Sequence, residues 1–234
     1  MLIPYDLHIH TCLSPCGDDE MTPINIANMA CLKGLRLIAV TDHNSARNVA
    51  AVIEAAADLP LTVIPGLELN TSEEIHIVCL FPDAASAEKA GEFVEDSLPP
   101  VLNKPEVFGS QFIMDKSENI VGEVPQLLIT ASTISVDDVG DFIAGYGGIC
   151  FPAHIDRSSN SIIEVFGAVP DYLGFMAVEV SDPDAFLSST SGRDICNRYR
   201  VLTNSDAHYL QNIAETERFL ELPGTGFDDL KRCF

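Results

Sequence analysis

Short apolar runs alternate with amphipathic stretches along most of the chain, and this alternation limits the possible folds more than any other feature. We expect strands at 3–10, 35–41, 61–69, 75–81, 148–153, 175–180, 200–204 and 218–222, and helices at 22–34, 48–57, 84–96, 136–144 and 227–233. Repeated strand–helix units with buried strands predict a parallel sheet flanked by helices. The length of 234 residues favours a compact barrel, since about 250 residues is typical of the eightfold version.

Residues 99–133 interrupt this alternation. Apolar runs at 108–114 and 120–124 flank the polar stretch 116–119, which is the pattern of a β-hairpin. We interpret 99–133 as an insertion within a single domain that spans 1–234. The sequence does not decide whether this insertion caps the site, recognises the substrate or forms an interface.

The histidines gather at strand ends. Five of the six lie at, or one or two residues past, the C-terminal end of a predicted strand, and only His76 lies near the start of one. The C-terminal ends of parallel strands converge on one face, which carries the chemistry in such folds. The six are His8, His10, His43, His76, His154 and His208.

The spacing of these residues indicates metal binding. His8 and His10 are two residues apart, so on a strand both imidazoles lie on the same side. Asp206 and His208 repeat that spacing with one carboxylate, and Glu68 follows the core of the third predicted strand. Histidine with Asp or Glu is a donor set for zinc, manganese or iron rather than calcium or magnesium.

The order of these motifs resembles the PHP (polymerase and histidinol phosphatase) family. The resemblance implies a distorted seven-stranded (β/α) TIM-like barrel that holds two or three divalent ions (Zn, Mn or Fe) at the strand C-termini. The matching stretches are DLHIHTCLSP at 6–15, AVTDHN at 39–44, PGLELNT at 65–71, IHIVCLF at 75–81, FPAHIDR at 151–157 and TNSDAHY at 203–209.

Carried onto this chain, the resemblance implies a ligand set for each ion. One ion is held by His8, His10, Glu68 and Asp206. A second takes His43, His208 and an acidic residue from the loop after His10. A third is shared by Glu68, His76 and His154, so that Glu68 bridges.

The loop after His10 departs from the family pattern. The family often has SDG there, with the Asp as a ligand, whereas this chain has the longer SPCGDDEMTP at 14–23. Counting back from Thr22 and Pro23 places Asp18 at the ligand position, with Cys16, Asp19 and Glu20 as alternatives. Asp42, just before His43, is expected to orient a ligand rather than to be one.

The resemblance and the ligand types predict a metal-dependent phosphoesterase. Clustered divalent ions lower the pKa of a bound water, which provides a hydroxide nucleophile, and they neutralise the phosphoryl oxygens. Arg157 is the candidate phosphate clamp, unless it only pairs with Asp156 or another carboxylate at the surface. Arg47 is a second, weaker candidate. The residues assigned to catalysis are Glu68, Arg157, Asp206 and His208.

Two other functions are compatible with the pattern. An amidohydrolase-like metal hydrolase also uses strand-end His and Asp, but it usually adds a strand-end lysine, and no lysine follows a predicted barrel strand here. A non-catalytic metal- or nucleotide-binding PHP protein would have little reason to keep every type of ligand. Turnover with added Mn(II) or Zn(II) would separate such a binding protein from an enzyme.

Charge and cysteine content suggest partners and compartment. With 35 acidic and 13 basic residues the formal net charge is −22. We therefore expect a small phosphorylated substrate, a nucleotide or a short oligonucleotide, and no long duplex nucleic acid or anionic membrane as partner. Seven cysteines without a CxxC pair, no signal-peptide pattern and no membrane-length apolar run predict a cytoplasmic protein with reduced, mostly buried thiols.

Overall fold

The computed structural model describes the backbone of residues 1–234 and every side chain except those at 187, 190 and 191. The strands are β1 (Leu2–Ile9), β2 (Leu37–Val40), β3 (Thr62–Asn70), β4 (His76–Leu80), β5 (Phe112–Met114), β6 (Ile120–Glu123), β7 (Ile149–Pro152), β8 (Ala177–Glu179), β9 (Arg200–Leu202) and β10 (Phe219–Glu221). The helices are α1 (Pro23–Leu32), α2 (Val49–Ala55), α3 (Ala84–Asp96), α4 (Pro105–Phe108), α5 (Val136–Gly145), α6 (Ile162–Phe166), α7 (Pro183–Ser188), α8 (Thr190–Arg198) and α9 (Phe227–Lys231), with 3-10 turns η1 (Asp171–Leu173) and η2 (Leu210–Asn212).

Six strands form one curled, half-barrel sheet in the order β10-β1-β2-β3-β4-β7. The expected seven-stranded parallel barrel is not confirmed over the described backbone, because β1, β2 and β3 are parallel but β4 is antiparallel to both β3 and β7. The link between β3 and β4 is only residues 71–75. Parallel neighbours need a crossover of a dozen or more residues, so this short link forces an antiparallel pair.

The strands β8 and β9 form a separate parallel pair at the open side of the sheet. The Ile155 N–H, just after β7, donates to the Glu179 carbonyl at 2.8 Å, and the His10 N–H donates to the Ala207 carbonyl at 3.0 Å. The first bond joins the end of β8 to the segment just after β7. The second joins the segment after β9 to the end of β1. The polar residues that follow β9 are thereby placed at the same mouth as those of β1.

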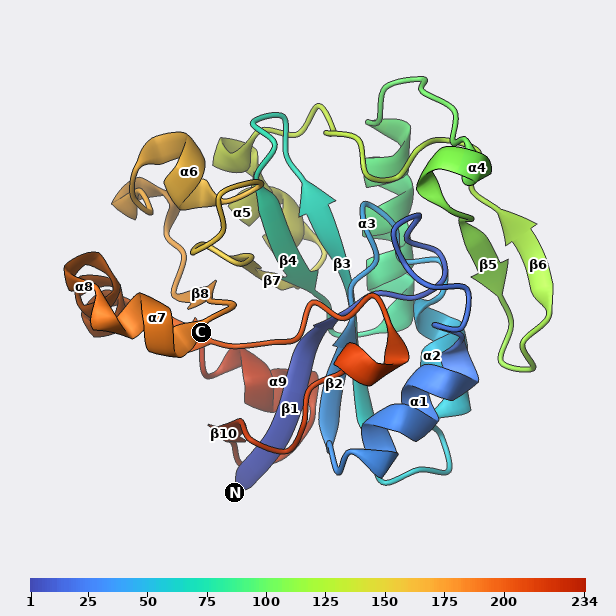
Figure 1. The fold of residues 1–234 in the computed structure, drawn as a ribbon, viewed down its shortest axis with the longest axis horizontal. Coiled ribbons are helices and arrows are strands. Elements are labelled where there is room, and N and C mark those ends of the chain that lie inside the picture. Colours follow the sequence, from blue (N-terminus) through green and yellow to red (C-terminus); the bar gives the residue numbers. More distant parts are fainter.

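The large sheet is buried on both faces. Along β2, Leu37 and Ala39 pack in the inner apolar cluster, whereas Ile38 and Val40 pack in the outer cluster with residues of α1, α2, α3 and α5. Burial on both faces explains why these strands are continuous apolar runs. Figure 1 shows the sheet between the β5–β6 hairpin at one edge of the molecule and α7 and α8 at the other.

The hairpin predicted within 99–133 forms from β5 and β6, which are antiparallel. Hydrogen bonds and apolar packing both attach it. The Phe112 N–H donates to the Cys12 carbonyl at 3.0 Å, and the Met114 N–H donates to Oδ1 of Asn48 at 2.8 Å. Ile113 of β5 packs against the buried cluster that contains Leu13 and Val124. The hairpin therefore braces the loop that follows β1.

All seven cysteines are free thiols, but only Cys12 and Cys79 are buried, so the expectation of mostly buried thiols is wrong. Of the helices in the described residues, none has the length and apolar character required to cross a lipid bilayer.

Candidate metal centre

The fold brings all six histidines to one end of the sheet. The C-terminal ends of β1, β2 and β3 lie at this end because those strands are parallel. His76 opens β4 and pairs with Asn70, the last residue of β3, so the reversed direction of β4 places a strand-start histidine at the same end. This explains why His76 did not fit the strand-end pattern of the sequence.

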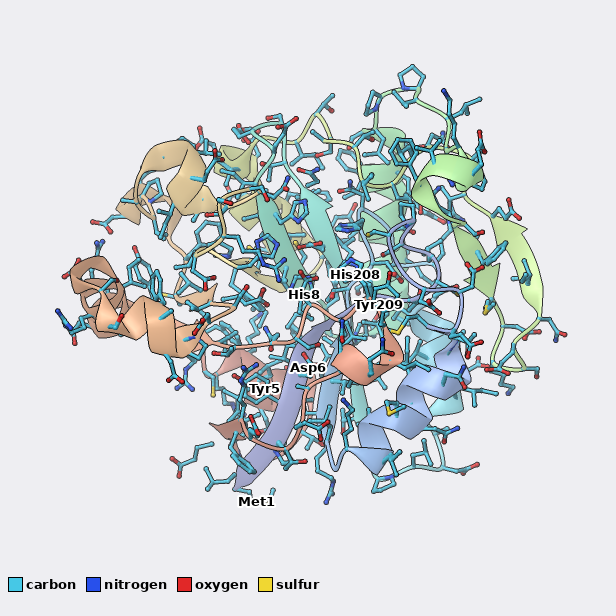
Figure 2. The ribbon with its side chains drawn as sticks, in the orientation of Figure 1. Met1, Tyr5, Asp6, His8, His208 and Tyr209 are labelled. Atoms are coloured by element: carbon cyan, nitrogen blue, oxygen red, sulfur yellow. The ribbon has the colours of Figure 1, made fainter. Side chains whose placement is uncertain are left out.

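An irregularity in β1 sets the direction of the first two imidazoles. The register with β2 shifts between Asp6 and Ile9, and Leu7 packs in the inner cluster whereas Ile9 packs in the outer one. Bulges of this kind re-aim side chains. The irregularity leaves His8 and His10 both on the inner side, with their Nε2 atoms 3.2 Å apart. Figure 2 labels His8 near the C-terminal end of β1.

Glu68 on β3 lies at the centre of the histidines. Its Oε1 lies 2.9 Å from Nδ1 of His76 and 3.3 Å from Nε2 of both His154 and His8. Its Oε2 lies 2.8 Å from Nδ1 of His43 and 3.5 Å from Nε2 of His10. The two oxygens of one buried carboxylate thus face two different sets of imidazoles.

Asp206 completes the group around the first two histidines. Its Oδ1 lies 3.3 Å from Nε2 of His8 and 3.1 Å from Nε2 of His10. Asp206 and His154 both have positive φ, 50° and 29°. Such conformations cost about 1–3 kcal/mol and persist where the surroundings enforce them, as they often do at functional sites.

Glu179, at the end of β8, is a functional residue that the sequence analysis missed. Nδ1 of His8 lies 3.1 and 3.0 Å from its two oxygens, and Asn204 donates to it at 2.6 Å. A carboxylate on Nδ1 fixes the tautomer and leaves Nε2 of His8 free to bind a metal. The available signal was its position as a carboxylate at the end of a predicted strand, like Glu68.

Asp42 orients the histidines through Ser14. The Ser14 hydroxyl donates to Oδ1 of Asp42 at 2.7 Å, and its oxygen accepts from Nδ1 of His10 at 2.9 Å and from the His43 N–H at 3.2 Å. Nε2 of His10 is then left facing the carboxylates. The role expected for Asp42, of orienting rather than binding, agrees with this chain of bonds.

The charges of the cluster shift its pKa values in both directions. Burial acts to lower the pKa of His8, but the carboxylates of Glu179, Asp206 and Glu68 outweigh it and raise that pKa well above its usual value. Burial, with the charges of His208 and His43, lowers the pKa of His10. Burial acts to raise the pKa of Glu68, but the surrounding imidazoles hold it well below its usual range.

The donor atoms fit divalent cations. Among the described side chains, five buried atoms of the cluster have no hydrogen-bond partner despite their close neighbours: Nδ1 of His43, Nδ1 of His154, both oxygens of Glu68 and Oδ1 of Asp206. Buried polar atoms are normally paired, so several unpaired atoms in one place call for another explanation, such as an ion. Three groups have mutually close donor atoms: His8/His10/Glu68, His43/Glu68/His76 and His10/His43/His208.

These three groups include neither the expected loop ligand, Asp18, nor its alternatives Cys16, Asp19 and Glu20. The Asp18 N–H donates to the His208 carbonyl at 2.9 Å, and its Oδ1 accepts from the Glu20 N–H at 2.9 Å. The backbone of Asp18 is thus held at the site, while its carboxylate caps the next turn of the loop. Counting residues from Thr22 could not detect this local hydrogen bond.

The two arginine candidates differ in position. Arg157 lines the metal pocket, and its Nη1 lies 2.5 Å from Oδ2 of Asp206. It therefore pairs with a carboxylate, as its alternative role expected, but that carboxylate belongs to the metal pocket. Arg47 instead forms bonds of 2.6 to 2.9 Å with Glu95. The residues described as lining the metal pocket include none from 99–133.

A cavity of about 700 Å³ adjoins the metal pocket, and Arg157 lines both. It lies among the segments that carry α6, α7 and α8, and its apolar lining includes Ile155, Phe186, Ile195 and Tyr199. An apolar cavity with convergent polar groups is the usual form of a small-molecule site.

Sequence comparison relates the chain to known proteins. A family profile described as PHP domain matches residues 6–146. An uncharacterised protein of Methanocaldococcus jannaschii is 32% identical over 104 residues, which cover 39% of this chain and 60% of that protein. A 5′-3′ exoribonuclease of Haemophilus influenzae is 32% identical over 79 residues, which cover 32% of this chain and 28% of that enzyme.

Solved structures share the fold at low identity. The lesion-specific endonuclease Q of Pyrococcus furiosus superposes with a TM-score of 0.68 at 17% identity, covering 99% of this chain and 55% of that one. A protein described as a metal-dependent phosphoesterase, from Bifidobacterium adolescentis, gives 0.64 at 16% identity, covering 98% and 94%. An amidohydrolase of Chromobacterium violaceum with bound sulfate gives 0.62 at 19% identity, covering 95% and 93%.

One of these likenesses corrects an expectation. An endonuclease Q complex, similar with a TM-score of 0.66, holds a 27-mer duplex substrate with an abasic lesion at its active site. The exclusion of long duplex nucleic acid from the acidic composition is therefore wrong. The net charge of a chain is an average, and it does not fix the field at a site where bound cations are the largest local charges.

Proposed function

This chain belongs to the PHP domain family, and on that premise we propose that it is a metal-dependent phosphoesterase acting on a small or nucleotide-type phosphoester. The observation that carries the proposal is the position of Glu68, whose two unpaired oxygens face separate sets of imidazoles. A bridging carboxylate of this kind is suited to a site with more than one divalent ion.

We assign the ligands from the observed contacts. His8, His10, Glu68 and Asp206 would hold one ion, and Glu68, His76 and His154 would hold another, because these side chains meet within 3.5 Å. His43 and His208 would hold a further ion. The donor set suits zinc, manganese or iron. When bound, such ions provide a nucleophile from water near neutral pH and neutralise phosphoryl charge.

The side chains prepare the site for this chemistry. Nδ1 of His208 lies 2.9 Å from the carbonyl oxygen of Asp206, to which it donates, so its Nε2 is left as the free donor atom. Arg157, at the rim of the pocket, would bind phosphoryl oxygens with its guanidinium, which presents donors in a fork that matches phosphate. The carboxylate of Asp206 holds that guanidinium beside the ligands.

The adjoining cavity supports a substrate with an organic leaving group. A phosphoryl group at the metal pocket would lie beside Arg157, and the group attached to it would reach the apolar surface of Ile155, Phe186 and Tyr199. A nucleoside or another ring of similar size fits such a cavity better than an extended polar chain.

The proposal is tested by hydrolysis assays after the protein has been stripped with a chelator and reloaded with Mn(II) or Zn(II). A panel of phosphomonoesters compared with bis(p-nitrophenyl) phosphate separates monoesterase from diesterase activity. His8→Ala, His43→Ala and His208→Ala should each abolish hydrolysis and lower metal content, whereas Asp18→Asn should retain both. Full activity in His8→Ala would contradict the proposal.

The likeness to an amidohydrolase keeps amide hydrolysis as a second candidate. Lysine, which such sites usually include, is not among the described residues that line the metal pocket. Turnover of amide substrates without turnover of any phosphoester would favour this candidate.

A further inference from the structure

The ion assigned to His43 and His208 has an incomplete set of ligands. The imidazole of His10 stacks on that of His208 with centroids 4.1 Å apart, but its Nε2 faces Asp206 and His8, at 3.1 and 3.2 Å. His10 thus serves the neighbouring ion. Two imidazoles remain, one of them with an unpaired, buried Nδ1 in His43, and structural and catalytic zinc sites need three or four protein ligands.

The loop after β1 is fixed above these two histidines. Ser14 bonds to the ring of His10 and to the backbone of His43, and the Asp18 N–H donates to the His208 carbonyl. Between these anchors Gly17 makes a tight turn, in which its N–H donates to the Ser14 carbonyl at 2.8 Å. A Cβ at Gly17 would come within 2.6 Å of the Thr11 carbonyl oxygen, so the turn requires glycine there.

This turn places Cys16 beside both imidazoles. The Cys16 thiol contacts the side chains of His43 and His208. Of the acidic side chains in this loop, the carboxylate of Asp18 is engaged with the Glu20 N–H. Asp19 and Glu20 are exposed, as Cys16 is, so it is the contact with His43 and His208 and not burial that distinguishes Cys16.

We propose that Cys16 is a thiolate ligand of the ion held by His43 and His208. The inference rests on the proposed metal centre but not on its reaction. A site with two imidazoles and one thiolate selects zinc or iron over manganese, because thiolate is a soft ligand and manganese prefers oxygen. The three ions would then differ in kind of ligand, with sulfur at only one of them.

Cobalt(II) tests this directly, because a thiolate bound to cobalt gives a near-ultraviolet charge-transfer absorption that nitrogen and oxygen ligands do not give. The metal-free protein is titrated with cobalt, and bound cobalt is counted by elemental analysis. We expect the band in the unmodified protein and in the control Cys31→Ser, and its loss in Cys16→Ser. Cys16→Asp should lose the band but retain the ion, since it keeps an anionic donor.

Affinity and reactivity provide independent readouts. Cys16→Ser should weaken the binding of one ion about tenfold or more, given that even outer partners of ligands contribute 10- to 100-fold. In the unmodified protein, metal should slow alkylation of Cys16, which is exposed, and this measurement needs no variant. A chain that binds no cobalt would overturn both this inference and the proposed function. Full cobalt occupancy without the band, or without protection of Cys16, would overturn this inference alone.

Discussion

Nδ1 of His8 lies 3.0 Å from Oε2 of Glu179, although the two residues are 171 positions apart in the chain. The same carboxylate accepts from the His154 N–H at 3.1 Å and from Asn204 at 2.6 Å. One buried side chain of the β8–β9 pair therefore orients a histidine of β1 and the turn that carries a histidine after β7. The β8–β9 pair therefore helps to position the ligands of the metal centre through Glu179.

Replacing Glu179 should weaken metal binding without removing a ligand. In Glu179→Gln an amide nitrogen, which donates and cannot accept, replaces one carboxylate oxygen, so the bonds from His8 and Asn204 cannot all be kept. We expect metal affinity to fall about 10- to 100-fold, measured by competition with a chelator. Glu221→Gln, on the exposed face of β10, is the matched control. Unchanged affinity would show that the orientation of His8 does not depend on Glu179.

Ser14→Ala should affect both stability and metal binding. The change removes the hydroxyl shared by Asp42, His10 and His43. It leaves buried polar groups unpaired, which costs about 1–3 kcal/mol. Chemical denaturation and metal titration measure the two effects, with Ser117→Ala in the exposed hairpin turn as control. Loss of stability with unchanged metal affinity would assign Ser14 a structural role only.

Arg157→Ala should lower kcat/KM for a phosphomonoester about tenfold or more, because hydrogen bonds between charged groups contribute about 1.5–3 kcal/mol. Metal content should stay the same, which separates loss of the phosphate clamp from loss of a ligand. Arg157→Lys should recover little, since an ammonium cannot form the bidentate contact. The exposed Arg36→Ala serves as control. If Arg157→Ala retains full kcat/KM, Arg157 only pairs with Asp206.

Metal affinity should rise with pH. The pKa values of His8 and His43 are raised in the metal-free protein: burial acts against this, but the neighbouring carboxylates outweigh it. These imidazoles therefore carry protons near neutral pH, and a metal ion must displace them. Calorimetry in two buffers of different ionisation enthalpy should show proton release on binding at pH 7. If metal affinity increased as the pH was lowered, protons would not compete with the ion at these histidines and the prediction would be wrong.

Filling the cavity beside Arg157 should discriminate among substrates by size. Ala185→Trp places a bulky ring in the cavity. We expect a higher KM for nucleotides, with little change for a phosphoester that has a small leaving group. Ala57→Trp, at an exposed position remote from this cavity, controls for surface effects. Equal loss for large and small substrates would place the leaving group elsewhere.

Many of the elements were predictable because their signals are local, although the helices α6, α7 and α8 were not expected. The α3 helix begins and ends as expected, at Ala84 and Asp96, and Asp83 caps it by accepting from the Ser86 N–H at 2.8 Å. Thr22 caps α1 as predicted, accepting from the Asn25 N–H at 3.3 Å. The apolar period of a helix, its capping residues and its turn residues all lie within a few positions of one another, so one amino-acid sequence is enough to recognise them.

The direction of β4 was not predicted, although the short link at 70–74 between the strands expected at 61–69 and 75–81 is a signal for it. The sequence marked 75–81 as a buried strand, but apolar content is the same for parallel and antiparallel strands. The short link after β3 decided the direction, and that direction brings His76 to the metal centre beside Glu68. With all strands expected to be parallel, His76 would lie at the wrong end of the sheet. Its place among the candidate ligands came only from the family resemblance.

The sequence by itself determined which donor atoms this protein offers: six histidines, Glu68 and Asp206, spaced so that strand ends can collect them. The tertiary structure decided which ring nitrogens of His8, His10 and His208 are engaged by other protein groups, and that Glu179 orients His8. It also decided that the carboxylate of Asp18 is engaged within its own loop. The reason is physical. Residue type and period are encoded locally, whereas tautomer, orientation and ligand partnership depend on hydrogen bonds between segments that meet only when the sheet has curled.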